Sequence, residues 1–219
     1  MRTDGYRNRK VLLAMAFALM AGVVSSALFP TPCSAEPGVA ESWSSMKTKG
    51  GLGSSNDGGG VAFGDINDNG KLDMILMGID DPSGPNKFWY WIGWDLNSDG
   101  EPTRWSSRKI AEIGLGHSNS GGGVALGDIN GNGKLDMILM GIDNPEKEDS
   151  FWYWVGWDLN SDGEPTRWSS KKTVKPGLGW ATVGGGVALG DINGNGKLDM
   201  ILMGIDDPSG PNKFWYWIG

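Results

Sequence analysis

The chain has 219 residues, with 26 Asp and Glu against 19 Lys and Arg, a net charge of −7, one His and one Cys. This acidic balance argues against nucleic acid and anionic membranes as partners, and it suits cations. With a single His, a single Cys and no GxSxG nucleophile motif, the common catalytic triads and zinc sites lack the residues they need, so we expect no enzymatic activity.

The first 35 residues are typical of a targeting segment. A basic start (Arg2 to Lys10) precedes nineteen uncharged residues from Val11 to Phe29, and small residues lead to Ala35, which is the layout of a secretory signal peptide. Cleavage after Ala35 removes Cys33 and leaves 15 Lys and Arg against 25 Asp and Glu, a net charge of −10. The alternative is an uncleaved membrane anchor. Both place the rest of the chain outside the cytoplasm, secreted or periplasmic.

A 63-residue repeat follows the leader. The sequence GGGVAFGDINDNGKLDMILMGID begins at Gly58 and recurs, with two changes, at Gly121 and Gly184. The repeats cover 58–120, 121–183 and 184–219, and the last is incomplete. Residues 36–57 form a lead-in that resembles the end of a repeat, so we expect it to supply the fourth strand of a sheet.

Each repeat is predicted to form four short strands. Their sequences are GVALGDI, LDMILMGI, FWYWIGW and RWSSRK. The second is apolar at nearly every position, which predicts burial on both faces. Four strands in roughly 60 residues, joined by a glycine-rich link to the next unit, are the pattern of a β-propeller blade. We therefore expect an all-β fold of about three blades, each with four antiparallel strands.

The turn between the first two strands carries a metal-ligand pattern. Oxygen-bearing side chains occupy positions 1, 3, 5 and 9, Gly occupies position 6, and the carbonyl of position 7 adds a ligand, as in the first nine positions of a calcium loop. Position 12 is Leu, so the turn is not an EF-hand. The alternative is an Asx-rich hairpin turn without metal. The predicted Ca²⁺ ligands are Asp65, Asn67, Asn69, Lys71 and Asp73 in the first repeat, Asp128, Asn130, Asn132, Lys134 and Asp136 in the second, and Asp191, Asn193, Asn195, Lys197 and Asp199 in the third.

A second turn, after the third strand, fits the pattern less well. It reads DLNSDGEPT, with Thr at position 9 where the first turn has Asp. A plain hairpin turn with Gly at a positive-φ position explains it equally well. The candidate ligands here are Asp95, Asn97 and Asp99 in the first repeat and Asp158, Asn160 and Asp162 in the second.

These motifs resemble those of a known family. VAFGDINDNGKLDMIL is similar to the FG-GAP (VCBS-type) repeat, the blade of integrin alpha-subunit propellers and of many exported bacterial proteins, and the resemblance covers residues 42–219. It implies a calcium-binding loop at the positions given above, and a role in adhesion or ligand binding. Rings of this family usually have seven blades, whereas this chain encodes about three.

The strand tryptophans, Trp180 and the single His are candidates for packing or for ligand binding. Packing between blades is the favoured interpretation of the strand tryptophans, and sugar stacking is the alternative. His117 and Trp180 lie in the glycine-rich links and are weak ligand candidates.

Two functions are consistent with the sequence. The first is an exported, calcium-stabilised module for extracellular binding or adhesion, with a glycan or a protein as its ligand. The alternative is an accessory propeller fragment of a larger secreted enzyme, a lyase or a hydrolase. Three blades are too few to close a ring. We therefore expect either a natural chain that continues beyond Gly219, which we favour, or a homo-oligomer that completes the ring.

Overall fold

The computed structural model describes residues 44–51, 56–80, 87–111, 119–143, 150–174, 182–206 and 213–219. The chain divides into two units, Met1–Thr48 and Lys49–Gly219, and all strands of the described residues lie in the second. The predicted leader and the loops with His117 and Trp180 fall outside the described residues. Residues 44–51 contain no strand, so the fourth strand expected in the lead-in is not seen there.

The first repeat forms an antiparallel sheet in which successive strands are neighbours. Its first three strands follow the predicted order, and the predicted fourth strand is present as two short strands that both pair with the third. The strands are β1 (Asn56–Gly64), β2 (Asp73–Asp80), β3 (Lys87–Leu96), β4 (Pro102–Trp105) and β5 (Lys109–Ala111).

The second and third sheets repeat this arrangement with equivalent register. The second contains β6 (Asn119–Gly127), β7 (Asp136–Asp143), β8 (Ser150–Leu159), β9 (Pro165–Trp168) and β10 (Lys172–Val174). The third contains β11 (Thr182–Gly190), β12 (Asp199–Asp206) and β13 (Lys213–Ile218). Every regular element in the described part of the chain is a β-strand, which confirms the all-β prediction. No helix suited to crossing a membrane occurs among these residues.

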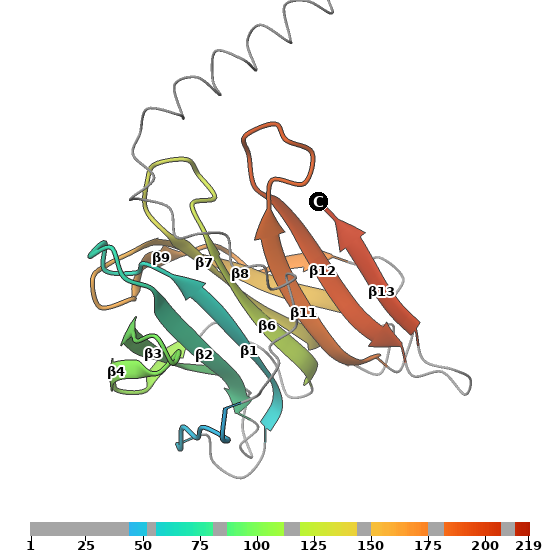
Figure 1. The fold of residues 1–219 in the computed structure, drawn as a ribbon. Helices are drawn as coiled ribbons and strands as arrows, with labels where there is room; N and C mark the ends of the chain where they lie inside the picture. Colours follow the sequence, from blue (N-terminus) through green and yellow to red (C-terminus); the bar gives the residue numbers. More distant parts are fainter. Residues whose placement is uncertain are drawn as a thin grey trace, which may run out of the picture. The chain divides into compact units, whose positions relative to one another are not determined.

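The three sheets pack in sequence order through their glycine-rich first strands, which lie side by side (Figure 1). A Cβ added to Gly60 would lie 2.9 Å from the backbone nitrogen of Val124, and one added to Gly123 would lie 2.9 Å from that of Val187. Stacked sheets are ordinarily about 10 Å apart. The absence of side chains on these strands allows the backbones to approach much more closely, which explains why each repeat opens with three glycines.

Each sheet has two faces of different composition, because successive residues of a strand point to opposite sides. We define the forward face by its residues in the first sheet: Gly58, Gly60, Ala62, Gly64, Ile75, Met77, Ile79, Phe88, Tyr90 and Ile92. We define the backward face by its residues in the second sheet: Gly122, Val124, Leu126, Met137, Leu139, Trp152 and Trp154. The forward face of one sheet packs on the backward face of the next.

Two clusters of buried side chains form at these interfaces. The larger lies between the first and second sheets, where the rings of Phe88 and Trp154 meet edge to face at 5.7 Å. The smaller lies between the second and third sheets, where Phe151 and Trp217 meet in the same way at 5.4 Å. The four residues occupy equivalent repeat positions, so the chain builds the same interface twice.

Burial of the second strand on both faces is confirmed only in the middle sheet. All residues of β7 from Asp136 to Ile142 are buried, whereas β2 and β12 alternate between more and less buried positions. The difference arises because β7 has a sheet on each side and the other two strands have a sheet on one side. The three sheets do not close on one another, and the first and third each keep one face without a sheet partner.

Candidate metal centre

The turn between β1 and β2 is organised by its first aspartate. The carboxylate of Asp65 accepts hydrogen bonds from the backbone N–H groups of Asn69 (2.9 Å) and Gly70 (2.6 Å). Positions 4 and 6 have positive φ: 57° at Asp68 and 80° at Gly70. This left-handed geometry is the one for which Gly is favoured, and Asp is among the few other residues that tolerate it. The chain therefore folds tightly around the position-1 carboxylate.

The equivalent turns in the other repeats have the same geometry. Asp128 accepts from the N–H groups of Asn132 (3.0 Å) and Gly133 (2.7 Å), and Asp191 accepts from those of Asn195 (2.9 Å) and Gly196 (2.7 Å). Position 4 is Gly in both, with φ of 74° and 73°. The three turns predicted to bind calcium thus share one backbone conformation.

The position-9 aspartate is buried and ties two turns together. Asp73 has no exposed surface, and its two carboxylate oxygens accept from the N–H groups of Ile66 (2.9 Å) and Asp95 (2.8 Å). Asp136 is equally buried and makes the same pair of bonds, to Ile129 (2.9 Å) and Asp158 (2.8 Å). A carboxylate buried with two N–H donors is well satisfied, because these are charge-assisted hydrogen bonds.

Asp95 contacts the first turn. Its carboxylate accepts from the Asn69 side-chain amide (2.7 Å) and lies 3.7 Å from the Lys71 ammonium. Asp95 has φ of 51°, and its equivalent Asp158 has φ of 50°. Such conformations are uncommon for residues other than Gly. Both aspartates therefore add a carboxylate to the neighbouring first turn.

The remainder of the second turn forms an ordinary hairpin. The side-chain oxygen of Asn97 accepts from the N–H groups of Asp99 (2.9 Å) and Glu101 (2.9 Å), and Asp99 is exposed. Asn160 makes the same bonds to Asp162 (2.9 Å) and Glu164 (3.0 Å). These hydrogen bonds are those of a hairpin turn, and the prediction of a second metal loop stays a prediction.

The contact of Asp95 with the first turn was not predicted, although the strand pairing carries a signal for it. In an antiparallel pair the start of β2 lies opposite the end of β3, and the register joins Met74 to Gly93. Asp73 must therefore lie near Asp95. Counting residues across the predicted hairpin would have placed both aspartates at one end of the sheet.

The local charges and amides favour the ionised form of Asp158. Hydrogen bonds from the side-chain amide of Asn132, and more weakly from that of Asn130, together with the charges of Lys134 and Arg167, hold the pKa of this carboxyl below its usual value. These interactions outweigh desolvation, which acts in the opposite direction.

The turns also carry the bonds of a metal-free Asx-rich turn. The side-chain oxygens of Asn69, Asn132 and Asn195 accept from the N–H group two residues later, at 3.0, 2.9 and 2.8 Å. Those of Asn130 and Asn193 accept in the same way, at 3.0 and 3.1 Å. These bonds fit both interpretations, because they shape the turn with or without an ion.

Asn67 differs from its equivalents Asn130 and Asn193, whose side-chain oxygens accept from a backbone N–H group. Its side-chain oxygen is buried and has no hydrogen-bond donor. Leaving a buried carbonyl oxygen unsatisfied costs roughly 1–3 kcal/mol. Asn67 occupies position 3, a ligand position in the predicted calcium loop, and a hard cation is a partner that would satisfy this oxygen.

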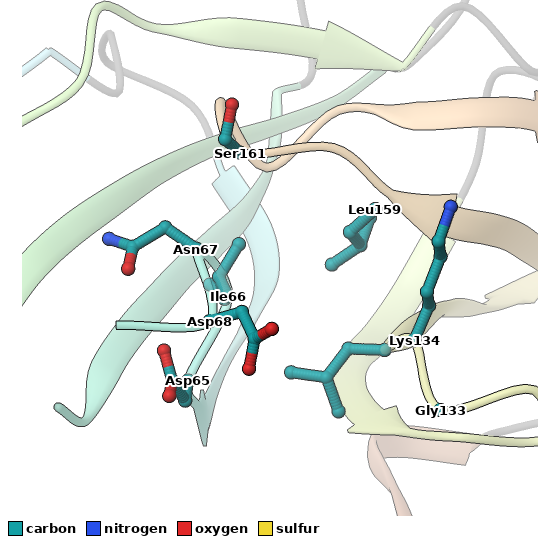
Figure 2. A pocket seen from close by; sticks show the side chains of 9 residues that line it. Asp65, Ile66, Asn67, Asp68, Gly133, Lys134, Leu159 and Ser161 are labelled. Atoms are coloured by element: carbon teal, nitrogen blue, oxygen red, sulfur yellow. The ribbon is translucent and has the colours of Figure 1, made fainter. Parts of the chain in front are cut away.

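A cavity of about 190 Å³ separates this turn from its equivalent in the second sheet. Figure 2 shows Asp65, Asn67 and Asp68 on one side, with Lys134 and Leu159 across from them. Asp68 turns toward the second sheet and Asn67 turns away from it. Asn67 thus lines the cavity together with Asp65 and Asp68.

Acidic side chains alone do not form a chelating group here. Across the residues with described positions, no group of three or more His, Cys, Asp or Glu side chains is placed to hold a metal ion. An ion at the first turn would need a mixed set of oxygens that includes the amides of Asn67 and Asn69 and the backbone carbonyl of Lys71. Such a set matches the oxygen preference of calcium.

The tryptophans of the third strands serve mainly in packing. Trp154 and Trp217 lie in the interfaces between sheets, and Trp91 is buried in the first sheet. Arg108 stacks over Trp89 at 3.9 Å and Lys171 over Trp152 at 3.3 Å, so these rings are covered by cations. The packing interpretation is confirmed for Trp154 and Trp217.

Comparison with known proteins gave no match. Neither the protein-family models, nor the curated proteins, nor the solved structures contain one that is similar to this chain.

Proposed function

We propose that this chain is an exported calcium-binding repeat protein of the FG-GAP type, without catalytic activity, which binds an extracellular glycan or protein. The observation that carries the calcium assignment is the buried, unsatisfied side-chain oxygen of Asn67. It lies in a turn that Asp65 and Asp73 already hold in one conformation. The secreted location is proposed from the leader sequence alone.

The blade assignment extends the proposal to the whole fold. Three antiparallel sheets in sequence order, packed face to face through their first strands, have the arrangement expected of successive propeller blades. The first turns occur once per sheet at equivalent positions, as the family resemblance implies. The role in adhesion or ligand binding rests on that resemblance.

Calcium binding is proposed to be weak. Each first turn contributes two carboxylates, at positions 1 and 9. Asp95 and Asp158 accept hydrogen bonds from the Asn69 and Asn132 amides of these turns, but the described acidic side chains form no group of three around one point. The position-9 carboxylate already has two N–H donors. Few free charged oxygens indicate an affinity on the order of 10⁻⁴–10⁻³ M, as in extracellular modules. Binding that is linked to folding raises the melting temperature as calcium increases.

The test uses melting curves and calorimetry of the purified chain. Calcium at millimolar concentration should raise the melting temperature, chelator should reverse the shift, and Asp136→Ala should remove one site from the calorimetric count. Asp162→Ala, an exposed residue of the second turn, is the matched control and should leave the count unchanged. Melting curves that respond neither to calcium nor to chelator would exclude the proposal.

Asn67→Ala separates a metal ligand from a structural side chain. In chelator this variant should be as stable as the parent or more stable, because the oxygen removed has no partner in the protein. In calcium it should lose the stabilisation that the first site provides. A variant that is equally destabilised in both conditions would show that Asn67 acts only in the fold.

A further inference from the structure

The chain exposes two sheet faces that match each other. The forward face of the third sheet has no sheet on it, and Phe214 (72%), Tyr216 (67%) and Ile218 (57%) are exposed. The backward face of the first sheet is uncovered at Val61 (49%) and Phe63 (52%). At equivalent positions inside the chain, Phe88, Phe151 and Ile92 have no exposed surface and Val124 has 4%. The exposed residues are thus of the types that the internal interfaces bury.

The match extends over the first three strands of the interface. All ten residues of the forward face in the first sheet recur with the same identity in the third: Gly184, Gly186, Ala188, Gly190, Ile201, Met203, Ile205, Phe214, Tyr216 and Ile218. The backward face of the first sheet repeats that of the second with one change, Phe63 in place of Leu126. The two free faces therefore carry nearly the same residues as two faces that already pack together.

The internal interfaces are also nearly identical in geometry. Cβ atoms added to Gly58 and Gly121 would each lie 2.7 Å from a backbone nitrogen of the next sheet. Those added to Gly60 and Gly123 would each lie 2.9 Å from one, and a Cβ at Gly122 or Gly185 would lie 2.7 Å from the preceding sheet's isoleucine. One mode of packing thus recurs wherever these two faces meet.

We propose that the free forward face of the third sheet docks on the free backward face of the first sheet of a second copy of this chain. The contact continues the packing that the chain repeats internally. Gly186 would lie against Val61 of the second copy, as Gly60 lies against Val124 and Gly123 against Val187. Phe214 would meet Trp91 of the second copy, as Phe88 meets Trp154. The contact is head to tail, so it builds a closed ring or an open filament.

Docking involves one local rearrangement. In the single chain, the Lys49 ammonium lies 5.2 Å from the ring of Trp91, and a Cβ at Gly51 would lie 3.2 Å from that ring. In the two internal interfaces, the equivalent tryptophan is contacted by a phenylalanine of the preceding sheet, Phe88 or Phe151. Lys49 and Gly51 therefore leave Trp91 when the second copy docks, while Val61 and Phe63 need no uncovering.

The decisive variant is Gly186→Ala. In its own chain a Cβ at Gly186 meets only the terminal methyl of Met203, at 3.6 Å, so the fold should remain intact. In the docked state the same Cβ would press on the backbone of the second copy. Sedimentation velocity of the full chain in calcium should show association for the parent, and a dissociation constant about tenfold higher or more for the variant. Gly60→Ala and Gly123→Ala, which meet backbone inside the chain, should instead lower the melting temperature.

A mixing experiment tests the head-to-tail geometry. Val61→Glu blocks the backward face of the first sheet and Gly186→Ala blocks the forward face of the third, so each variant alone should be monomeric. Their mixture retains one good face of each kind and should form pairs but nothing larger. A parent chain that stays monomeric over the accessible concentrations overturns the proposal. So does association that Gly186→Ala leaves unchanged, such as association through the apolar segment 11–29, and so does a mixture that forms no pairs.

Discussion

At the scale of single residues, the position-9 aspartate is both a predicted calcium ligand and a hydrogen-bond acceptor for the backbone. Only the first role was predicted from the sequence. As a predicted calcium ligand, Asp73 closes the first turn. In the structure it also holds the backbone of Ile66 and Asp95, and so joins the turn before β2 to the end of β3. The carboxylate therefore supports the fold even without a metal, because two buried N–H groups depend on it.

We expect Asp73→Ala to destabilise the chain by about 3 kcal/mol in the presence of chelator, because two backbone donors lose their only observed acceptor. The measurement is urea unfolding with a chelator present, so that loss of calcium does not contribute. Asp99→Ala is the control: its side chain is exposed, and the change should stay within about 0.5 kcal/mol. Equal stability of the two variants would show that the carboxylate matters only through calcium.

At the scale of elements, the fourth strand of the first and second sheets is interrupted where the sequence has two serines. Ser106 fills the interruption: its N–H donates to the Ile92 carbonyl (2.8 Å) and its hydroxyl accepts from the Ile92 N–H (2.9 Å). Ser169 does the same for Val155, at 2.8 and 3.0 Å. The prediction of one continuous strand over RWSSRK was therefore correct in position but not in continuity.

The second turns of the first two sheets have the same sequence but different packing contacts. Gly100 and Gly163 have φ of 73° and 71°, so a side chain is strained equally at both. A Cβ at Gly100 meets nothing, whereas one at Gly163 would collide with Ile92 and approach Ile66 at 3.4 Å. The turn of the second sheet thus packs on the first sheet.

Gly163→Ala should therefore destabilise the chain by about 1–3 kcal/mol more than Gly100→Ala. The backbone strain cancels between the two variants, and the difference reports the packing of this turn on Ile92 and Ile66. Chemical denaturation of both variants at equal calcium measures it. If the two lose the same stability, the turn of the second sheet does not rest on the first sheet in solution.

At the scale of the whole molecule, stability depends on contacts between repeats. Phe88, Phe151 and Phe214 are equivalent, yet the first two are fully buried and the third is 72% exposed. Only the first two have a following sheet whose tryptophan packs against them. The burial of a residue thus depends on whether another sheet packs on the face that carries it.

Phe151→Ala should destabilise the chain by about 3–4 kcal/mol, because it removes a buried aromatic ring and leaves a cavity. Phe214→Ala, the same change at an exposed position, should cost less than about 0.5 kcal/mol. Thermal or denaturant unfolding at high dilution, where copies are apart, makes the comparison. Similar losses for both variants would mean that Phe214 is already covered under those conditions.

The sequence by itself determined the strands, their order and the turns. Strand patterning, glycines at positive φ and the 63-residue repeat are local features, and each is set by residues close together in the chain. The repeat also located the first turns, including Asn67, at the ends of the first strands. The prediction that these turns bind calcium remains a prediction.

Only the tertiary structure decided how these local features combine. It placed Asp95 at the first turn, 22 residues beyond Asp73, where the Asp95 N–H donates a hydrogen bond to the Asp73 carboxylate. It showed that the opening glycines serve backbone contact between sheets, and that equivalent residues are buried in one sheet and exposed in another. The physical reason is that a repeat specifies the same faces every time, while burial depends on whether another sheet lies against them.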